Sequence, residues 1–247
     1  MAASQTFETP FVEEIDLGGP VVKFFCPNKR SASRATTVLT KKPEVTAWLD
    51  AMEPGSVLWD IGANIGAYTL YAATVKRCTV VAFEPSAANY FVINRNIELN
   101  KLQHIARALC IAVGAGLHID HLYLSSTDYA EAFSNFGGAV DFQGNSFDAT
   151  YRQGCVSFSL DDLVKTDLPF PNYIKVDVDG LESDIVEAGT GVLSDTRLQS
   201  VIVELDVGRP KLVEKAIATL RRCGLAMEGS TEPLRGRLVI NAAFRRI

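Results

Sequence analysis

The sequence predicts an α/β fold in which strands alternate with helices and a ligand binds at the carboxyl ends of the strands. Two segments carry this prediction. Residues 57–73 read VLWDIGANIGAYTLYAA, an apolar run that ends in an acid, turns through two glycines and continues as a helix-forming stretch. Residues 79–85 read TVVAFEP, a second apolar run that ends in an acid. A buried strand, a tight turn, a helix and a further strand begin an open, doubly wound sheet.

Bulk properties restrict the class of protein. The 247 residues, 47% of them hydrophobic, suit one large domain, or one domain with extensions. The net charge of -5 argues against a broad nucleic-acid surface. The five cysteines form no CxxC pair, which favours free thiols in a reducing compartment over zinc or disulfides. Neither a secretory signal nor a membrane-spanning run is evident, so we expect a cytoplasmic protein without nucleic-acid or membrane partners.

Residues 1–56 are expected to form an N-terminal extension, and residues 57–247 the core domain. Within the extension, a turn at 18–20 precedes a short strand at 21–25. Residues 43–52 are expected to form a helix that Pro54 and Gly55 terminate. Whether this extension supports a homodimer is left open by the sequence.

The core continues with the same alternation until a polar, glycine-rich and aromatic stretch at about 115–155 interrupts it. That stretch contains one strand-like segment, 118–124, and reads either as a lid over the site or as a surface excursion anchored by its aromatic residues. The other expected core elements are a helix at 86–100, a strand at 105–113, an ordered segment at 156–160, a short helix at 161–164, a strand at 172–179, helices at 181–188 and 210–223, a strand at 200–205, and an antiparallel closing pair at 226–228 and 237–244.

The first turn and the second acid are the candidate binding residues. Gly62 lets the backbone turn sharply and approach a ligand, and Gly66 lets the helix start pack close to the strand. Asn64 tolerates a positive φ or hydrogen-bonds within the loop. Glu84 lies about 20 residues after the loop, where nucleoside-binding α/β units place a carboxylate that accepts hydrogen bonds from ribose hydroxyls.

Three blocks together resemble the FkbM family of S-adenosylmethionine-dependent methyltransferases. They are DIGANIG at 60–66, AFEP at 82–85 with asparagines at 94–100, and SLDD at 159–162 leading to IKVDVDGLE at 174–182. The resemblance covers roughly residues 57–206. It implies a class I, Rossmann-like methyltransferase with a mostly parallel seven-stranded sheet and an antiparallel final strand. Asp179 departs from the family pattern, because many members have Glu there.

The resemblance also implies roles for individual residues. The loop from Asp60 through Gly62, Ala63 and Asn64 to Gly66 would hold the methionine end of S-adenosylmethionine, with Asp60 on its ammonium directly or through water. Glu84, followed by Pro85, would bind the ribose. Backbone groups near Val113 would frame the adenine by analogy with the fold. The expected acceptor is a small molecule methylated on a hydroxyl oxygen, either a sugar or a secondary metabolite.

Asp177 and Asp179 stand at the end of the strand expected at 172–179 and, two residues apart, would project to one side. As a pair they could raise one another's pKa and supply a base, with Asp177 also contacting the cofactor. With Glu204 or Asp206 they could instead hold Mg²⁺, although no metal ligand is assigned. A third interpretation is that Asp179 only caps the following helix.

Two other functions compete with the methyltransferase. A glycine turn plus a ribose acid also suits a NAD-dependent oxidoreductase, but Asn64 replaces the second glycine of the G-x-G-x-x-G pattern. The third alternative is a module that binds S-adenosylmethionine without catalysis. The acids at 60, 84, 177 and 179 argue for cofactor binding but leave turnover open.

Overall fold

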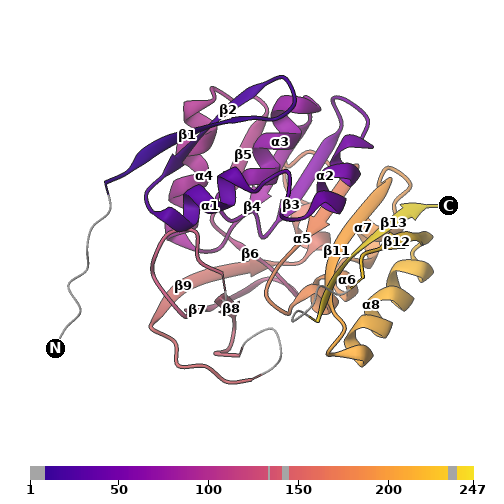
Figure 1. Ribbon diagram of the computed structural model, residues 1–247. Coiled ribbons are helices and arrows are strands. Elements are labelled where there is room, and N and C mark those ends of the chain that lie inside the picture. The colour runs from indigo at the N-terminus through magenta and orange to yellow at the C-terminus, as the bar shows by residue number, and fades with distance from the viewer. Residues whose placement is uncertain (1–8, 133, 141–144, 233–237) are drawn as a thin grey trace.

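A computed structural model describes residues 9–132, 134–140, 145–232 and 238–247 (Figure 1). Its centre is a seven-stranded sheet in the order β12-β13-β11-β10-β3-β4-β5. Strands β11, β10, β3, β4 and β5 are parallel neighbours, while β13 runs antiparallel to both β11 and β12. The predicted doubly wound sheet with an antiparallel final strand is therefore confirmed.

The helices and strands of the central sheet follow the predicted order, except that the short helix α7 was not predicted. The strands of the central sheet are β3 (Val57–Ile61), β4 (Thr79–Phe83), β5 (Ala106–Leu109), β10 (Tyr173–Val176), β11 (Ser200–Asp206), β12 (Leu225–Ser230) and β13 (Val239–Arg246). The helices that connect or flank them are α3 (Ala67–Val75), α4 (Ala87–Leu99), α5 (Leu160–Leu163), α6 (Glu182–Glu187), α7 (Thr190–Ser194) and α8 (Pro210–Arg222). Arg237, the expected first residue of the last strand, lies outside the described residues.

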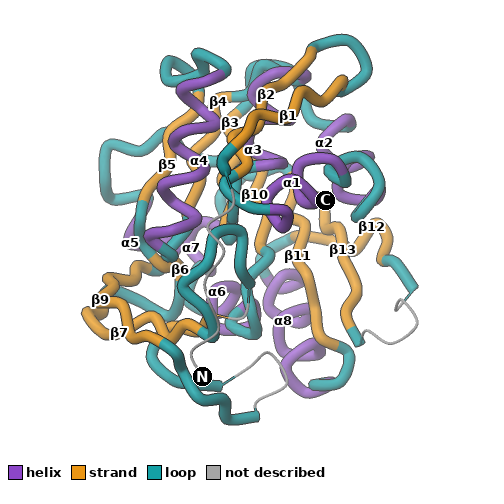
Figure 2. Tube along the Cα trace, turned by 60° about the vertical axis from the view of Figure 1, so that its left-hand side comes forward, coloured by secondary structure: helices purple, strands orange, loops and turns teal. Residues whose placement is uncertain are grey.

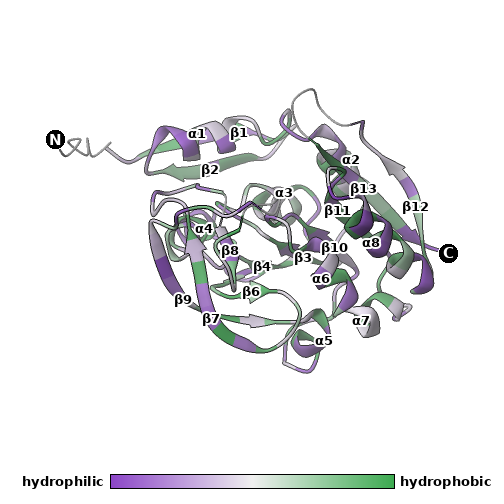
Figure 3. Cartoon of the chain, turned by 90° about the horizontal axis from the view of Figure 1, so that it is seen from below, coloured by the Kyte–Doolittle hydropathy of each residue, from purple (hydrophilic) through white to green (hydrophobic). Residues whose placement is uncertain are grey.

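Each face of the sheet is covered by its own hydrophobic core. Successive side chains of a strand point to opposite faces, so Leu58 and Trp59 join different cores. The Leu58 face packs against α3, α4 and the N-terminal extension, whereas the Trp59 face packs against the helices α5 to α8. In Figure 3 the strand β4 is green, whereas α8 carries purple residues on its outer side. The carboxyl ends of β3, β4, β10 and β11 remain available for a site.

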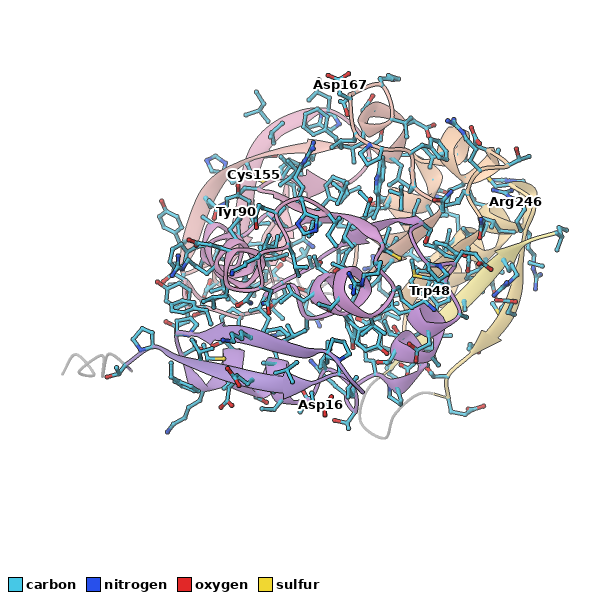
Figure 4. The ribbon with its side chains drawn as sticks, turned by 90° about the horizontal axis from the view of Figure 1, so that it is seen from above. Asp16, Trp48, Tyr90, Cys155, Asp167 and Arg246 are labelled. Atoms are coloured by element: carbon cyan, nitrogen blue, oxygen red, sulfur yellow. The ribbon has the colours of Figure 1, made fainter. Side chains whose placement is uncertain are left out.

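The N-terminal extension is part of this architecture rather than a separate unit. It contains an antiparallel hairpin, β1 (Phe11–Asp16) and β2 (Val21–Cys26), followed by α1 (Lys29–Thr36) and α2 (Pro43–Asp50). The prediction missed β1 and α1. Trp48 of α2, labelled in Figure 4, donates a hydrogen bond from Nε1 to Ser200 Oγ of β11 at 2.9 Å. Asn96 Oδ1 of α4 accepts from the Phe25 backbone N–H at 2.7 Å. The extension is thus anchored to the sheet and to α4.

The strand expected at 105–113 is two strands that belong to different sheets. After β5, the chain leaves the central sheet and β6 (Ala112–Val113) pairs in parallel with β9 (Tyr151–Phe158). With β7 (His118–Leu124) and β8 (Ser134–Phe136) these strands form a four-stranded sheet, which Figure 2 shows beside the central one. The stretch expected at 115–155 therefore supplies β7, β8 and the start of β9 to a second sheet, with loops between them. Among the described residues, no helix is long and apolar enough to cross a membrane.

Candidate active site

The loop after β3 touches the loop after β10. Gly62 has a φ of 76°, and a Cβ at this residue would lie 2.0 Å from the backbone oxygen of Asp177. Glycine is therefore required at residue 62 for two reasons: the positive φ of the turn and the close approach of the Asp177 backbone. Gly66 also has a positive φ, but a Cβ there would meet Ile93 of α4 at 2.5 Å. Its close packing is therefore against a helix, not against the strand as predicted.

Asn64 shapes this loop, as predicted. Its φ is 53°, and its side-chain oxygen accepts a hydrogen bond from the Ile65 backbone N–H at 3.0 Å. Its backbone N–H donates to Glu84 Oε2 at 2.8 Å, and its side-chain amide donates to the backbone oxygen of Glu131 at 2.7 Å. Asn64 therefore connects the glycine loop both to Glu84 and to the backbone at Glu131.

Glu84 is buried at the end of β4, with its carboxylate directed into the site. Besides Asn64, its carboxylate accepts from the Ser86 backbone N–H at 3.0 Å and from Asn89 Nδ2 at 3.4 Å. Burial raises the pKa of Glu84 to about 7, against the lowering effect of these hydrogen bonds. Each carboxylate oxygen has two lone pairs, so the group retains capacity for the hydroxyls of a ribose.

Asp60 lies beneath the loop rather than in it. The side chain is fully buried, and its two oxygens accept hydrogen bonds from Thr69 Oγ1 at 2.7 Å and from Lys175 Nζ at 3.0 Å. The direct contact with the cofactor ammonium that the sequence suggested is not supported by this position. Asp60 instead fixes Lys175, whose ammonium also lies 3.5 Å from Asp177 and over the Tyr68 ring.

Lys42 joins the two acids at the ends of β10 and β11. Its Nζ lies 2.8 Å from Asp177 Oδ2 and 2.6 Å from Glu204 Oε1. Burial tends to raise the pKa of Asp177, but Lys42 and Lys175 outweigh it and hold this pKa below its usual range. Burial, followed by the charge of Asp177, raises the pKa of Glu204 to about 7. At neutral pH the two carboxyl groups therefore differ, with Asp177 ionised and Glu204 in exchange with its protonated form.

Asp177 and Asp179 are not the pair that the sequence predicted. Strand β10 ends at Val176, so both residues lie in the loop that follows, where the alternation of a strand does not apply. Asp177 faces Lys42 and Glu204, whereas Asp179 Oδ2 accepts from the Ser134 backbone N–H at 3.3 Å. The acid that shares the environment of Asp177 is Glu204, which the sequence analysis considered only as a metal ligand.

Two cavities open on these residues. The larger, about 720 Å³, is bounded by the glycine loop including Ala63, the acids of β10 and β11, and helix α1. The smaller, about 120 Å³, is bounded by Glu84, Pro85, Val113 and Phe136. Gly62, Asn64, Asp177 and Asp179 line both. The predicted cofactor residues thus gather around one continuous site, apart from Asp60 beneath it and Gly66 at the start of α3.

A short segment at residues 129–132 forms a roof over the smaller cavity. The backbone of Ala130, at a φ of 62°, donates from N–H to Asn89 Oδ1 at 2.8 Å and accepts from Arg34 Nε at 2.8 Å. Asn28 Nδ2 donates to the Tyr129 backbone oxygen at 3.0 Å, and Arg30 forms an ion pair with Glu131. We call residues 129–132 the roof segment. It is held from one side by α4 and the glycine loop, and from the other by α1.

The residues present fit S-adenosylmethionine. The absence of a Cβ at Gly62 permits a close junction between two strand ends, and the buried carboxylate of Glu84, a group suited to ribose hydroxyls, lies close to it. For a metal the fit is poorer, because the Lys42 ammonium lies between Asp177 and Glu204, where a cation was considered. Within the described ranges, no group of three or more His, Cys, Asp or Glu side chains is arranged to hold a metal ion.

The sequence analysis missed the contribution of residues 28–42. Arg30, Arg34, Lys41 and Lys42 all line the larger cavity. A signal was present in the sequence, because residues 27–43 contain five Lys and Arg residues and no acid, in a chain of net charge -5. Such a run is usually a solvated surface, and only the fold shows that it faces the acids of the site.

Comparison with known proteins gives a consistent result. The model of the family described as methyltransferase FkbM domain matches residues 60–225. Hexuronic acid methyltransferase AglP of Haloferax volcanii is 25% identical over 220 residues, which cover 85% of this chain and 80% of that protein. Methyltransferase 1 of Beauveria bassiana is 30% identical over 167 residues, covering 61% of this chain and 64% of its own length.

Solved structures show the same fold at low identity. The methyltransferase domain of METTL16 superposes with a TM-score of 0.53 at 15% identity, covering 95% of this chain and 86% of that chain. TYW2 of M. jannaschii in complex with AdoMet gives a TM-score of 0.51 at 13% identity, covering 97% and 88%. These likenesses support the class I methyltransferase fold.

Proposed function

The chain belongs to the FkbM family of methyltransferases, and we propose that it transfers a methyl group from S-adenosylmethionine to a hydroxyl oxygen of a small acceptor such as a sugar. The observation that carries this proposal is the junction of the two cavities at Gly62 and Asp177. The smaller cavity is lined by Glu84, the proposed ribose ligand. The larger cavity is lined by Glu204, whose pKa is raised to about 7. A nucleoside and an acceptor would therefore meet at the glycine loop.

The smaller cavity supports a nucleoside-binding role. Glu84 provides acceptors for the ribose hydroxyls, while Val113 and Phe136 provide apolar surface for a base. Its 120 Å³ is below the roughly 300–1,000 Å³ typical of ligand pockets. We therefore propose that the roof segment moves outward when the nucleoside enters and then closes over it.

Glu204 is the residue that we assign as general base. S-Adenosylmethionine supplies a methyl group already activated by a sulfonium, so the protein must orient the acceptor and remove its proton. An ionised carboxylate near its pKa is suited to that task. Asp177, which the sequence analysis paired with Asp179 as a candidate base, is held ionised by two lysines, which makes it a weak proton acceptor. We propose that Asp177 positions Lys42 and raises the pKa of Glu204.

Asp179 keeps a different proposed role. It lines both cavities and hydrogen-bonds the start of β8. We propose that Asp179 ties the small sheet to the cofactor loop, rather than acting as the base. The support for a sugar acceptor is separate and comes from the relative named as a hexuronic acid methyltransferase.

Calorimetric titration tests the cofactor part of the proposal. The purified protein is titrated with S-adenosylmethionine, S-adenosylhomocysteine and NAD, with and without Mg²⁺. We expect micromolar binding of the first two, without a requirement for Mg²⁺. Binding of NAD alone would return the assignment to an oxidoreductase.

A variant tests the base. Glu204→Gln keeps the size of the side chain and removes its ability to accept a proton. We expect methyl transfer to fall about 10²–10⁴-fold, as for loss of a general base, with S-adenosylhomocysteine affinity unchanged. A rate within threefold of the wild type would exclude Glu204 as the base. A folded protein that binds the cofactor but methylates no hydroxylated acceptor would instead favour the non-catalytic binding module.

A further inference from the structure

Helix α1 turns a polar stripe toward the larger cavity. Arg30, Ser33, Arg34 and Thr37 are spaced as i, i+3, i+4 and i+7, which places them on one helix face, and all four line the cavity. The residues Ser31 and Ala35, on the opposite side of α1, are buried. A helix in a protein of this kind ordinarily turns its apolar face inward. Here a face of cations and hydroxyls borders a cavity instead.

Arg34 is the central residue of this stripe. It lines both cavities, and burial lowers its pKa, against the raising effects of Asp177, Glu84 and Asp179. Its Nε donates to the Ala130 backbone oxygen at 2.8 Å, which fixes the plane of the guanidinium. Among the residues that the structure describes, Lys42 is paired with two carboxylates and Arg30 with Glu131, whereas Arg34 has a backbone carbonyl as its hydrogen-bond partner.

Strand β11 contributes acceptor groups to the lining of the larger cavity, among them Asp206. Asp206 Oδ1 accepts from the Gly208 backbone N–H at 2.9 Å. Asp206 Oδ2 is buried and has no hydrogen-bond partner in the described part of the chain. A buried acceptor without a partner costs free energy that a ligand donor would recover. Asp206 is also among the residues that line the larger cavity, so a hydroxyl of a ligand bound there would be a donor within reach of its carboxylate group.

We propose that the acceptor is a polyhydroxylated anion, with an oxyanion group bound by Arg34 and a hydroxyl bound by Asp206. This inference rests on the methyltransferase function proposed above and specifies its substrate class. A guanidinium matches the geometry of carboxylate and phosphate oxygens through paired N–H donors. Ser33 and Thr37 supply further hydroxyls on the same helix face. The hydroxyl that reacts would face Glu204, between the two anchors.

Binding of simple sugars to the protein saturated with S-adenosylhomocysteine tests the inference. The probes are D-glucuronate, D-glucose 1-phosphate and D-glucose, measured by calorimetry or by NMR titration. We expect one or both anions to bind about tenfold or more tightly than glucose, because a charge-assisted hydrogen bond is lost with the neutral sugar. The two anions distinguish a carboxylate from a phosphate as the preferred group.

Variants of Arg34 and of Asp206 test which residue produces the preference for anions. Arg34→Gln is expected to remove the preference for the anions, Arg34→Lys to retain part of it, and Asp206→Asn to weaken the anions and glucose alike. Arg95→Gln is the control, because Arg95 pairs with Glu98 on the exposed side of α4. Melting temperatures verify that each variant is folded.

Three results would overturn the inference. The first is that the anions bind no more tightly than glucose, or that none of the three sugars binds while S-adenosylhomocysteine does. The second is that Arg34→Gln leaves the anion preference intact. The third is that Arg34→Gln weakens S-adenosylhomocysteine instead, which would assign Arg34 to the methionine carboxylate. If the wild type does not bind S-adenosylhomocysteine, the proposed function itself fails and this inference falls with it.

Discussion

Glu84 allows the cofactor site to be tested without knowledge of the acceptor, through the pH dependence of binding. Its pKa is raised to about 7 by burial. Ribose hydroxyls donate hydrogen bonds, and the ionised carboxylate is the form that accepts them with all of its lone pairs. Binding should therefore favour ionised Glu84, and affinity should rise as the pH passes upward through about 7.

The magnitude follows from the fraction of ionised Glu84. With a pKa near 7, about one tenth of the carboxyl groups are ionised at pH 6 and about nine tenths at pH 8. If the ionised form alone is competent, the Kd for S-adenosylhomocysteine should be about tenfold higher at pH 6 than at pH 8. Above pH 8 the affinity should level off.

Calorimetry at half-unit intervals from pH 5.5 to 8.5 measures this profile, and the variants identify its source. Glu84→Gln should bind more weakly and lose the dependence, because an amide does not ionise in this range. Glu204→Gln should keep it, since Glu204 titrates in the same range but faces the larger cavity. Glu98→Gln, an exposed position on α4, should match the wild type. A flat wild-type profile, or a slope that survives in Glu84→Gln, would refute the assignment of Glu84 to the ribose.

Three further predictions concern the loop, the ion pairs and the C-terminal strand. Gly62→Ala should weaken S-adenosylhomocysteine binding more than tenfold and lower the melting temperature, because the new Cβ would lie 2.0 Å from the Asp177 oxygen in a backbone of positive φ; an unchanged Kd and melting temperature would contradict the close contact. Lys42→Met should lower the free energy of unfolding by about 1–3 kcal/mol, since it leaves the half-buried Glu204 without its cation, while Asp177 keeps Lys175 at 3.5 Å. That loss should be larger at pH 8 than at pH 6, because the raised pKa of Glu204 means that its charge appears as the pH rises through about 7; urea unfolding at both pH values would show it, and an equal loss would argue against the close pair. Arg246→Ala should cost about 2 kcal/mol or more of unfolding free energy, because its guanidinium donates to the carbonyls of Leu193, Asp195, Leu198 and Cys223. In this last variant cofactor affinity should stay at the wild-type value, and a change would show that the distant strand influences the site.

Local sequence patterns predicted the core of the fold because each element carried its own signal. The strand, glycine turn and helix at 57–75 combine an apolar run with residues that tolerate a positive φ, and the structure has β3, the loop and α3 there. Glycine at 62 and 66 and asparagine at 64 could be assigned for the same reason. What the patterns did not contain was the partner of each residue, so Gly66 was assigned to the wrong neighbour.

The errors lie where long-range pairing decides the structure. An apolar stretch at 105–113 contains no local sign that its two halves belong to different sheets, which depends on β9 about 45 residues later. In the same way, the acids 177 and 179 were expected to act together because they are close in sequence. The pairing of Asp177 with Glu204 arises from neighbouring parallel strands, β10 and β11, and from a lysine more than 130 residues away.

The site divides between two parts of the chain that differ in their relation to the family. The residues proposed to contact the cofactor, from Gly62 to Asp177, lie within the segment 60–225 that the family model matches. Of the residues that line the larger cavity, Arg30, Arg34, Lys41 and Lys42 lie before it, whereas Lys175, Glu204 and Asp206 lie within it. The residues proposed for the cofactor thus lie wholly within the family match, whereas those proposed for the acceptor lie partly outside it, on α1.

The extension is nevertheless bound to the core too firmly to be an optional addition. Val22, Phe24 and Leu49 are fully buried in the same hydrophobic cluster as Leu58 of the central sheet. Lys42 pairs with Asp177 and Glu204, and since Asp177 also has Lys175, the negative charge that depends on Lys42 is that of Glu204. Removal of residues 1–56 would expose this apolar surface and leave that charge uncompensated, so we expect it to unfold the sheet rather than simply broaden the range of acceptors. The proposed acceptor recognition and the folding stability thus both involve this segment, which is why point changes on the cavity side of α1, and not truncations, are the appropriate way to separate them.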